Sequence, residues 1–234
     1  MVIFLVLDAS GLNSAETQDN FARDYAARGS YRKALECYKR ALEIRRERIG
    51  EFSSETVTSY VNLAKMYSAL LEYDNALEAL LDALKINRKF NSSEHLSMGV
   101  LYSSIAQVYD AKNEFETSLE YYTQALAINE KTFGTHPNTV TLLSKTANSC
   151  FAHKDYEKAL DYYKRAVRTN EDLHGMAHVS NAVLYEKLGD TYFETNDTPN
   201  AEKFYNSAIS TYKSVRAENG DDCKRVLEKF QRIL

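Results

Sequence analysis

Five segments of this chain repeat the same spacing of small residues at a nearly constant period. When the segments are aligned, three columns contain only Ala, Ser or Gly, and neighbours within a column are 41 or 42 residues apart. The first column is Ala22, Ala64, Ala106, Ala147 and Gly189. The other two follow it at offsets of 12 and 19 residues and are Ala34, Ala76, Ser118, Ala159, Ala201 and Ala41, Ala83, Ala125, Ala166, Ala208. Such a period predicts a stacked repeat array in place of one globular core.

Each repeat has the apolar spacing of two helices. In the second repeat Leu63, Ala64 and Tyr67 share one helical face, a polar turn follows, and the helical period restarts at Ala76. Small residues are needed where the two helices cross, because the axes can then approach closely. We therefore expect five helix–turn–helix units and one C-terminal helix, eleven helices in all, with no β-sheet in residues 15–234.

Residues 31–42 carry a recognisable repeat signature. Their sequence, Tyr-Arg-Lys-Ala-Leu-Glu-Cys-Tyr-Lys-Arg-Ala-Leu, closely resembles the tetratricopeptide (TPR) repeat. The usual TPR period is about 34 residues. The longer period here, with Asn-Leu-Ala at 62–64 and Phe-Gly-Thr-His-Pro at 133–137, resembles the kinesin light chain subgroup. The resemblance covers residues 15–215 and implies an all-α fold, a right-handed α-solenoid of antiparallel helix pairs (TPR superhelix).

This organisation divides the chain into three parts. Residues 1–14 are an unassigned apolar segment, and 220–234 are a capping helix. The five units are expected at about 15–56, 57–98, 99–139, 140–181 and 182–219. The capping helix has one apolar stripe, which is Cys223, Val226, Leu227, Phe230, Ile233 and Leu234. We expect this stripe to cover the last repeat and the opposite face to meet water. That opposite face is Lys224, Arg225, Glu228, Lys229 and Arg232.

The charge of the chain and its apolar segments argue against two classes of function, nucleic-acid binding and membrane insertion. The formal net charge is −4 and the pI is near 5.8, which argues against a nucleic-acid partner. A basic run, Arg45, Arg46 and Arg48, alternates with acidic residues, and we interpret it as a solvated, salt-bridged helix face. The apolar run at 1–7 is too short to span a bilayer, so no membrane insertion is expected.

No motif for catalysis, a metal or a cofactor is found. His174 and His178 are four residues apart, but Gly175 interrupts the helix that a metal site would need. Phosphate loops, nucleophile elbows and Cys-His arrangements do not occur. The three cysteines are an odd number without a pairing pattern, which favours a reducing, cytoplasmic location. We therefore expect a protein that is not an enzyme and needs no cofactor.

Function is then expected from the concave surface, which in a TPR superhelix is lined by the first helix of each unit. The helical period predicts a peptide-binding groove made of Asn20, Arg23, Asn62, Lys65, Ser103, Gln107, Lys145, Asn148 and Lys187. Amides and hydroxyls can hydrogen-bond an extended peptide backbone, and the cations can pair with carboxylates. Glu186 and Asp190 are expected to make the last unit of the groove acidic. By resemblance, Asn62 carries the peptide-facing amide. Asp19 stands where a chaperone-type carboxylate clamp has a cation.

Two functions remain open at this point. The first is an interaction module or scaffold, similar to a cargo adaptor, that holds an extended acidic segment of a protein partner. The second is a structural or regulatory array that acts through its convex face or its ends, including one attached to a catalytic domain outside this chain. In that second case the polar residues of the groove are only solvated.

Overall fold

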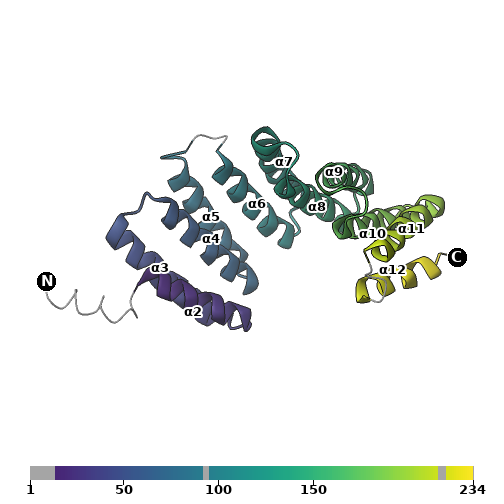
Figure 1. Ribbon diagram of the computed structural model, residues 1–234. Helices are drawn as coiled ribbons and strands as arrows, with labels where there is room; N and C mark the ends of the chain where they lie inside the picture. Colours follow the sequence, from purple (N-terminus) through teal and green to yellow (C-terminus); the bar gives the residue numbers. More distant parts are fainter. Residues whose placement is uncertain (1–13, 92–94, 216–219, 234) are drawn as a thin grey trace. The chain divides into compact units, whose positions relative to one another are not determined.

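The computed structural model describes residues 14–91, 95–215 and 220–233, and this part of the chain is entirely helical apart from turns and caps. Eleven helices are found there, as predicted, and none of the described residues lies in a strand (Figure 1). They are α2 (Ala15–Ala27), α3 (Tyr31–Ile49), α4 (Ser54–Ala69), α5 (Tyr73–Asn87), α6 (Leu96–Ala111), α7 (Phe115–Phe133), α8 (Pro137–Ala152), α9 (Tyr156–His174), α10 (Val179–Glu194), α11 (Thr198–Ser214) and α12 (Asp221–Gln231). The expected apolar segment lies outside the described residues except for Ser14.

The helices form two compact units, and the division between them in the sequence lies between Glu114 and Phe115. In unit 1, α2 packs on α3 and α4 on α5, and contacts of α3 with α4 and of α5 with α6 join successive pairs. In unit 2, α8 packs on α9 and α10 on α11, with α7 and α12 at the two ends of this series. The four pairs that lie inside one unit therefore have the helix–turn–helix packing that the repeat predicts.

All fifteen residues of the three small-residue columns are buried, as their predicted place at the helix crossings requires. The alanines among them are at most 2% exposed. Gly189 shows why the column excludes larger side chains. A Cβ atom at this position would lie 2.6 Å from Cδ1 and Cε1 of Tyr205 on the paired helix, so that the ring would have to move.

The turn inside each pair has the same backbone conformation in all five repeats. One residue adopts a positive φ between 58° and 73°, in a column made of Gly29, Leu71, Asn113, Lys154 and Asn196. Only Gly takes this left-handed conformation without a steric cost, and Asn tolerates it better than most residues. The second repeat therefore has an unfavourable residue at this turn. Leu71 has a bulky side chain in a left-handed backbone conformation, and its 70% exposed side chain gains little from packing.

Histidines are the N-cap residues of α6, α8 and α10, which are the first helices of the third, fourth and fifth repeats. The Nδ1 atoms of His95, His136 and His178 accept hydrogen bonds from the backbone N–H groups two residues later. These side chains satisfy N–H groups that have no partner within a helix. The described residues contain no cluster able to hold a metal ion. Helices α4, α6, α8 and α10 each begin three residues before the expected starts of their units at 57, 99, 140 and 182.

Candidate peptide-binding groove

The predicted groove residues lie on the first helices of the pairs and repeat with the same period as the core. One column is Asn20, Asn62, Ser104, Lys145 and Lys187, and a second is Arg23, Lys65, Gln107, Asn148 and Asp190. A third column contains Asp19, Val61, Ser103, Ser144 and Glu186. All nine predicted binding residues are exposed or half-buried. Those on α2, α4 and α6 belong to unit 1, and those on α8 and α10 belong to unit 2.

In unit 1, two cavities lie between α4 and α6. The larger has a volume of about 360 Å³ and is lined by Ser54, Val57, Thr58, Val61, Asn62, Lys65, Asn87, Asn91, His95, Ser97, Val100 and Leu101. The smaller, of about 190 Å³, is lined by Val61, Ala64, Lys65, Ser68, Leu80, Ser104, Gln107 and Val108. Because both cavities share Val61 and Lys65, we treat them as one depression and call it the α4/α6 groove. It brings together three predicted residues, Asn62, Lys65 and Gln107, whereas Ser103 does not line it.

A substitution in the second helix explains why a cavity forms beside Lys65. The column beneath this row of side chains is Tyr38, Leu80, Tyr122, Tyr163 and Tyr205. In unit 2 the Tyr163 hydroxyl donates a 2.6 Å hydrogen bond to Oδ1 of Asn148. The shorter Leu80 has no hydroxyl group and lines the cavity instead. Lys65 therefore has no tyrosine hydroxyl beside it. Within the described part of the chain, neither Asn62 nor Lys65 has a side-chain hydrogen bond or ion pair.

The wall of the groove that is formed by the α5–α6 connection is polar but internally satisfied. Nδ2 of the buried Asn87 donates to Oγ of Ser97 at 2.8 Å, and Nδ2 of Asn91 donates to Oδ1 of Asn87 at 2.8 Å. His95 Nδ1 lies 2.8 Å from the same Ser97 hydroxyl. Since these groups bond one another, the wall is held in place and the free polar groups of the groove are on α4.

On α2 the polar side chains pair with each other or with the next helices. Arg23 donates a hydrogen bond to Asn20 Oδ1. Arg45, which we expected on a solvated face, instead pairs with Asp19 and donates a 2.7 Å hydrogen bond to Oγ of Ser59. Its side chain is only 18% exposed. Arg46 and Arg48 are exposed, and Arg46 pairs with Glu51, as expected. For Arg45 the expectation was wrong, because Arg45 lies where α3 meets both α2 and α4, and its contacts join these three helices.

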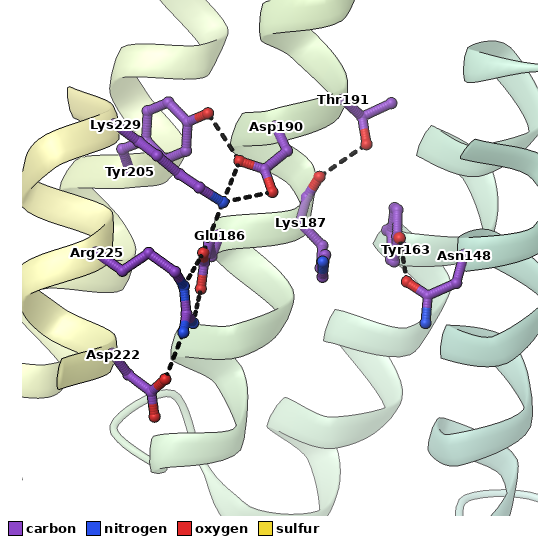
Figure 2. A network of polar contacts seen from close by, with 10 residues as sticks. All are labelled: Asn148, Tyr163, Glu186, Lys187, Asp190, Thr191, Tyr205, Asp222, Arg225 and Lys229. Carbon is purple, nitrogen blue, oxygen red and sulfur yellow. Dashed lines mark hydrogen bonds and ion pairs between the residues drawn. The ribbon is translucent and has the colours of Figure 1, made fainter. Parts of the chain in front are cut away.

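In unit 2, α12 covers the face of α10 that carries Glu186 and Asp190 (Figure 2). Nε and Nη2 of Arg225 donate to the two carboxylate oxygens of Glu186 at 2.8 and 2.7 Å, and Nζ of Lys229 donates to Glu186 at 2.7 Å. The same Nζ lies 2.8 Å from both oxygens of Asp190, which also accepts from the Tyr205 hydroxyl at 2.9 Å. Glu186 is 2% exposed.

Two expectations are corrected by this network. Glu186 and Asp190 do not form an open acidic end of the groove, and Arg225 and Lys229 do not face only water. Burial alone would raise the pKa of Glu186, but the hydrogen bonds and charges of Arg225 and Lys229 outweigh it and hold the pKa below its ordinary value. Burial and the Asp190 carboxylate raise the pKa of Tyr205, so the phenol stays protonated as a hydrogen-bond donor.

The other predicted residues of unit 2 lie outside this network. Asn148 is held through its Oδ1 by Tyr163 and presents its Nδ2 away from that ring (Figure 2). Lys187 shares α10 with the acids but takes no part in the hydrogen bonds between α10 and α12 that Figure 2 marks. Lys145 and Lys187 are half-buried. Sequence reasoning missed the α12 network, although the carboxylates at positions 186 and 190 and the cations at 225 and 229 have the same four-residue spacing.

Comparison with known proteins agrees with this architecture. The family model for the tetratricopeptide repeat matches residues 13–89, 55–131, 97–172 and 139–214, in overlapping segments that cover most of the chain. Among curated proteins no relative matches the chain. Within the described residues, none of the helices has the length and apolar character that crossing a membrane requires.

Solved structures show the same fold at low sequence identity. A putative kinesin light chain with nearly identical TPR-like repeats from Podospora anserina has a TM-score of 0.76 at 21% identity, over 86% of this chain and 95% of that one. BtubC (BKLC) from P. vanneervenii has a TM-score of 0.75 at 22% identity, over 86% and 80% of the two chains. Aspartyl phosphate phosphatase F from Bacillus subtilis has a TM-score of 0.76 at 13% identity, over 96% and 55%. The all-α solenoid and the resemblance to kinesin light chain-type repeats are thereby confirmed as statements about fold.

Proposed function

Because the chain belongs to the tetratricopeptide repeat family, whose members are generally non-catalytic scaffolds for protein–protein interaction, we propose that it binds an extended acidic segment of a protein partner. The α4/α6 groove of unit 1 is the central part of the proposed site. The observation that carries the proposal is the pair Asn62 and Lys65, which line this groove without a partner among the described residues.

The chemistry of these two side chains matches an extended peptide. A primary amide has both donors and an acceptor, so Asn62 can bond the N–H and C=O groups that an extended backbone leaves unpaired. Lys65 adds a cation one helical turn later, which favours a peptide carboxylate. The apolar neighbours Val61, Val100 and Leu101 limit the access of water and so strengthen both interactions.

The remaining predicted residues extend the same preference within each unit. Arg23 on α2 adds a second exposed cation to unit 1, although it first has to leave Asn20. In unit 2, Lys145, Asn148 and Lys187 supply two cations and an amide on the corresponding face of α8 and α10. Exposed charge pairs contribute only about 0–1 kcal/mol each. We therefore propose an affinity near the micromolar range that weakens as salt increases.

A double substitution tests the groove directly. Asn62→Ala with Lys65→Ala removes both free groups, and a matched control, Asn75→Ala with Lys85→Ala, removes an exposed amide and an exposed cation from α5. Fluorescent ten-residue peptides rich in Asp and Glu serve as probes, with Asn/Gln and Lys versions for comparison. Thermal melting is measured first for each variant.

We expect the acidic probes to bind the unsubstituted chain and the α5 control variant equally. They should bind the Asn62→Ala/Lys65→Ala variant at least tenfold more weakly. Equal binding by all three chains would exclude the α4/α6 groove and favour a site on the convex face or at an end of the array. Equal binding of the acidic and the Lys-rich probes would reject the charge preference.

We also propose a reducing, cytoplasmic location. It is supported by Cys37, Cys150 and Cys223, which are all buried and form no disulfide, so that nothing about them favours an oxidising compartment.

A further inference from the structure

The last repeat has two carboxylates, Glu186 and Asp190, on one face of its first helix. At the corresponding positions the first repeat has one carboxylate and the other three repeats have none. In the columns of Glu186 and Asp190, the other repeats carry Asp19 with Arg23, Val61 with Lys65, Ser103 with Gln107, and Ser144 with Asn148. Two acids one helical turn apart repel each other, and burying them is unfavourable unless cations are bound. This face of α10 therefore requires two cationic side chains to pair with its carboxylates.

In the structure α12 supplies that pair. Arg225 and Lys229 are also four residues apart, so both project from one side of a helix toward the acids (Figure 2). Between them Val226 is buried, as is Cys223 one turn earlier. The α10 face thus recognises a short amphipathic helix with a small apolar stripe and two cations one turn apart.

The fit of α12 to this face is incomplete. Only Cys223 and Val226 are buried, while Leu227, Phe230 and Ile233 remain half-exposed. The hydroxyl of the buried Tyr212, which interacts with charges on Glu186, Asp222 and Arg225, has no hydrogen-bond partner in the described part of the chain. An eleven-residue helix is also marginal by itself. A helix that offered an acceptor to Tyr212 or a larger apolar stripe would bind this face more favourably than α12 does.

We infer that the α10 face of unit 2 is a binding site for a basic amphipathic helix of a protein partner, and that α12 occupies this site in cis and is displaced when the partner binds. The inference does not depend on the α4/α6 groove, because it concerns other residues, another unit and a ligand of opposite charge. The complementary charges of Glu186 and Asp190 specify the class of partner, a helix with Arg or Lys at positions i and i+4.

Cys223 reports directly on this exchange. Cys223 lies on the packed face of α12 and is 1% exposed, whereas Cys150 is 0% exposed in the core of unit 2 and Cys37 is 9% exposed in the core of unit 1. Pulses of iodoacetamide followed by peptide mapping give an alkylation rate for each thiol in the full chain. Selective labelling of Cys223 means that α12 has left the site, and labelling of Cys150 as well means that unit 2 has unfolded.

The probe is a synthetic peptide of residues 220–234 with Cys223→Ser, and the control peptide also carries Arg225→Gln and Lys229→Gln. The tethered α12 competes at an effective concentration of about millimolar, so the peptides are added up to that range. The full chain with Lys229→Gln is examined in parallel, because its weakened α12 should be displaced at lower concentrations of the probe.

We expect the basic probe to raise the Cys223 alkylation rate to a plateau, with Cys37 and Cys150 unchanged, and the control peptide to have no effect. Lys229→Gln alone should raise the basal Cys223 rate about tenfold, since it leaves buried carboxylates without one of their cations. Rates that the probe leaves unchanged in both chains would overturn the inference and make α12 a permanent cap. Formation of a dimer with exchanged α12 helices, seen as a doubled mass without added peptide, would also overturn it, because the occupant would then be a second copy.

Discussion

Arg225 binds Glu186, a residue that lies 39 positions earlier in the chain, through two hydrogen bonds of 2.8 and 2.7 Å. This pair connects α12 to α10 within unit 2. It also neutralises the Glu186 carboxylate, which is 2% exposed.

The Glu186 network makes the stability of unit 2 depend on pH. The titratable or charged groups that face Glu186 are Asp190 on α10, Tyr205 and Tyr212 on α11, and Asp222, Arg225 and Lys229 on α12. The pKa of Glu186 is lower in the folded chain than its ordinary value of 4.5. Its ionised form therefore stabilises the fold above that ordinary value, and this stabilisation is lost as pH falls through the lower, folded-state pKa.

We predict that the thermal midpoint changes little between pH 7 and 5 through this group and decreases below pH 4.5. Glu186→Gln should lower stability at pH 7 by about 1–3 kcal/mol, because charged hydrogen bonds are lost. The gap between the variant and the parent should narrow toward pH 3. Melting curves at four pH values measure both effects, and a gap that stays constant with pH would contradict the assignment.

Two tyrosines of α11 should respond in opposite directions to loss of the hydroxyl group. Tyr205 donates to Asp190, so Tyr205→Phe is expected to destabilise the protein by about 1 kcal/mol. The buried Tyr212 hydroxyl has no partner among the described residues, so Tyr212→Phe should be neutral or stabilising. Urea denaturation of the two variants compares them directly, and a larger loss for Tyr212→Phe would show that its hydroxyl is bonded.

The left-handed turn of the second repeat is a site for stabilisation. Leu71 has φ 62° and is exposed, and Leu71→Gly should raise the free energy of unfolding by about 0.5–1 kcal/mol, after the entropy cost of Gly is subtracted. The reverse substitution, Gly29→Leu, is the control. A Cβ atom at Gly29 would meet nothing within 4 Å, so its predicted loss of stability comes from the backbone alone. Equal melting temperatures for all three chains would contradict the strain argument.

The small-residue columns should not tolerate larger side chains. Ala125 is 0% exposed on α7, and Ala125→Leu should destabilise the protein by about 1–3 kcal/mol through overpacking. Gln124→Leu adds a similar side chain at the neighbouring exposed position and should change stability by less than about 0.5 kcal/mol. Guanidinium denaturation measures both variants. An unchanged midpoint for Ala125→Leu would mean that the column does not mark the helix crossing.

The architecture could be predicted from the sequence because its determinants are local and repeated. A small residue such as Ala76 or Ala159 is required at every crossing of neighbouring helices, so one contact recurs with the period of the chain. A single residue that differs from its column, such as Leu80 among the tyrosines, does not obscure such a repeated pattern. For the same reason, the helical period correctly predicted that the nine candidate binding residues are exposed or half-buried and not part of the core.

Which polar groups are free was decided only by tertiary packing. Arg45 and Glu186 both have the sequence context of a solvated helix face, yet Arg45 is half-buried and Glu186 is buried, each in a network with residues 14 to 43 positions away. Asn62 and Lys65 have the same context and remain without partners in the described chain. The helical period specifies the direction of a side chain relative to its own helix, but its partners depend on what the neighbouring helices place opposite it. For the same reason, the sequence predicted that the C-terminal helix covers the last repeat, but only the folded chain reveals that Arg225 and Lys229 of α12 pair with Glu186 and Asp190.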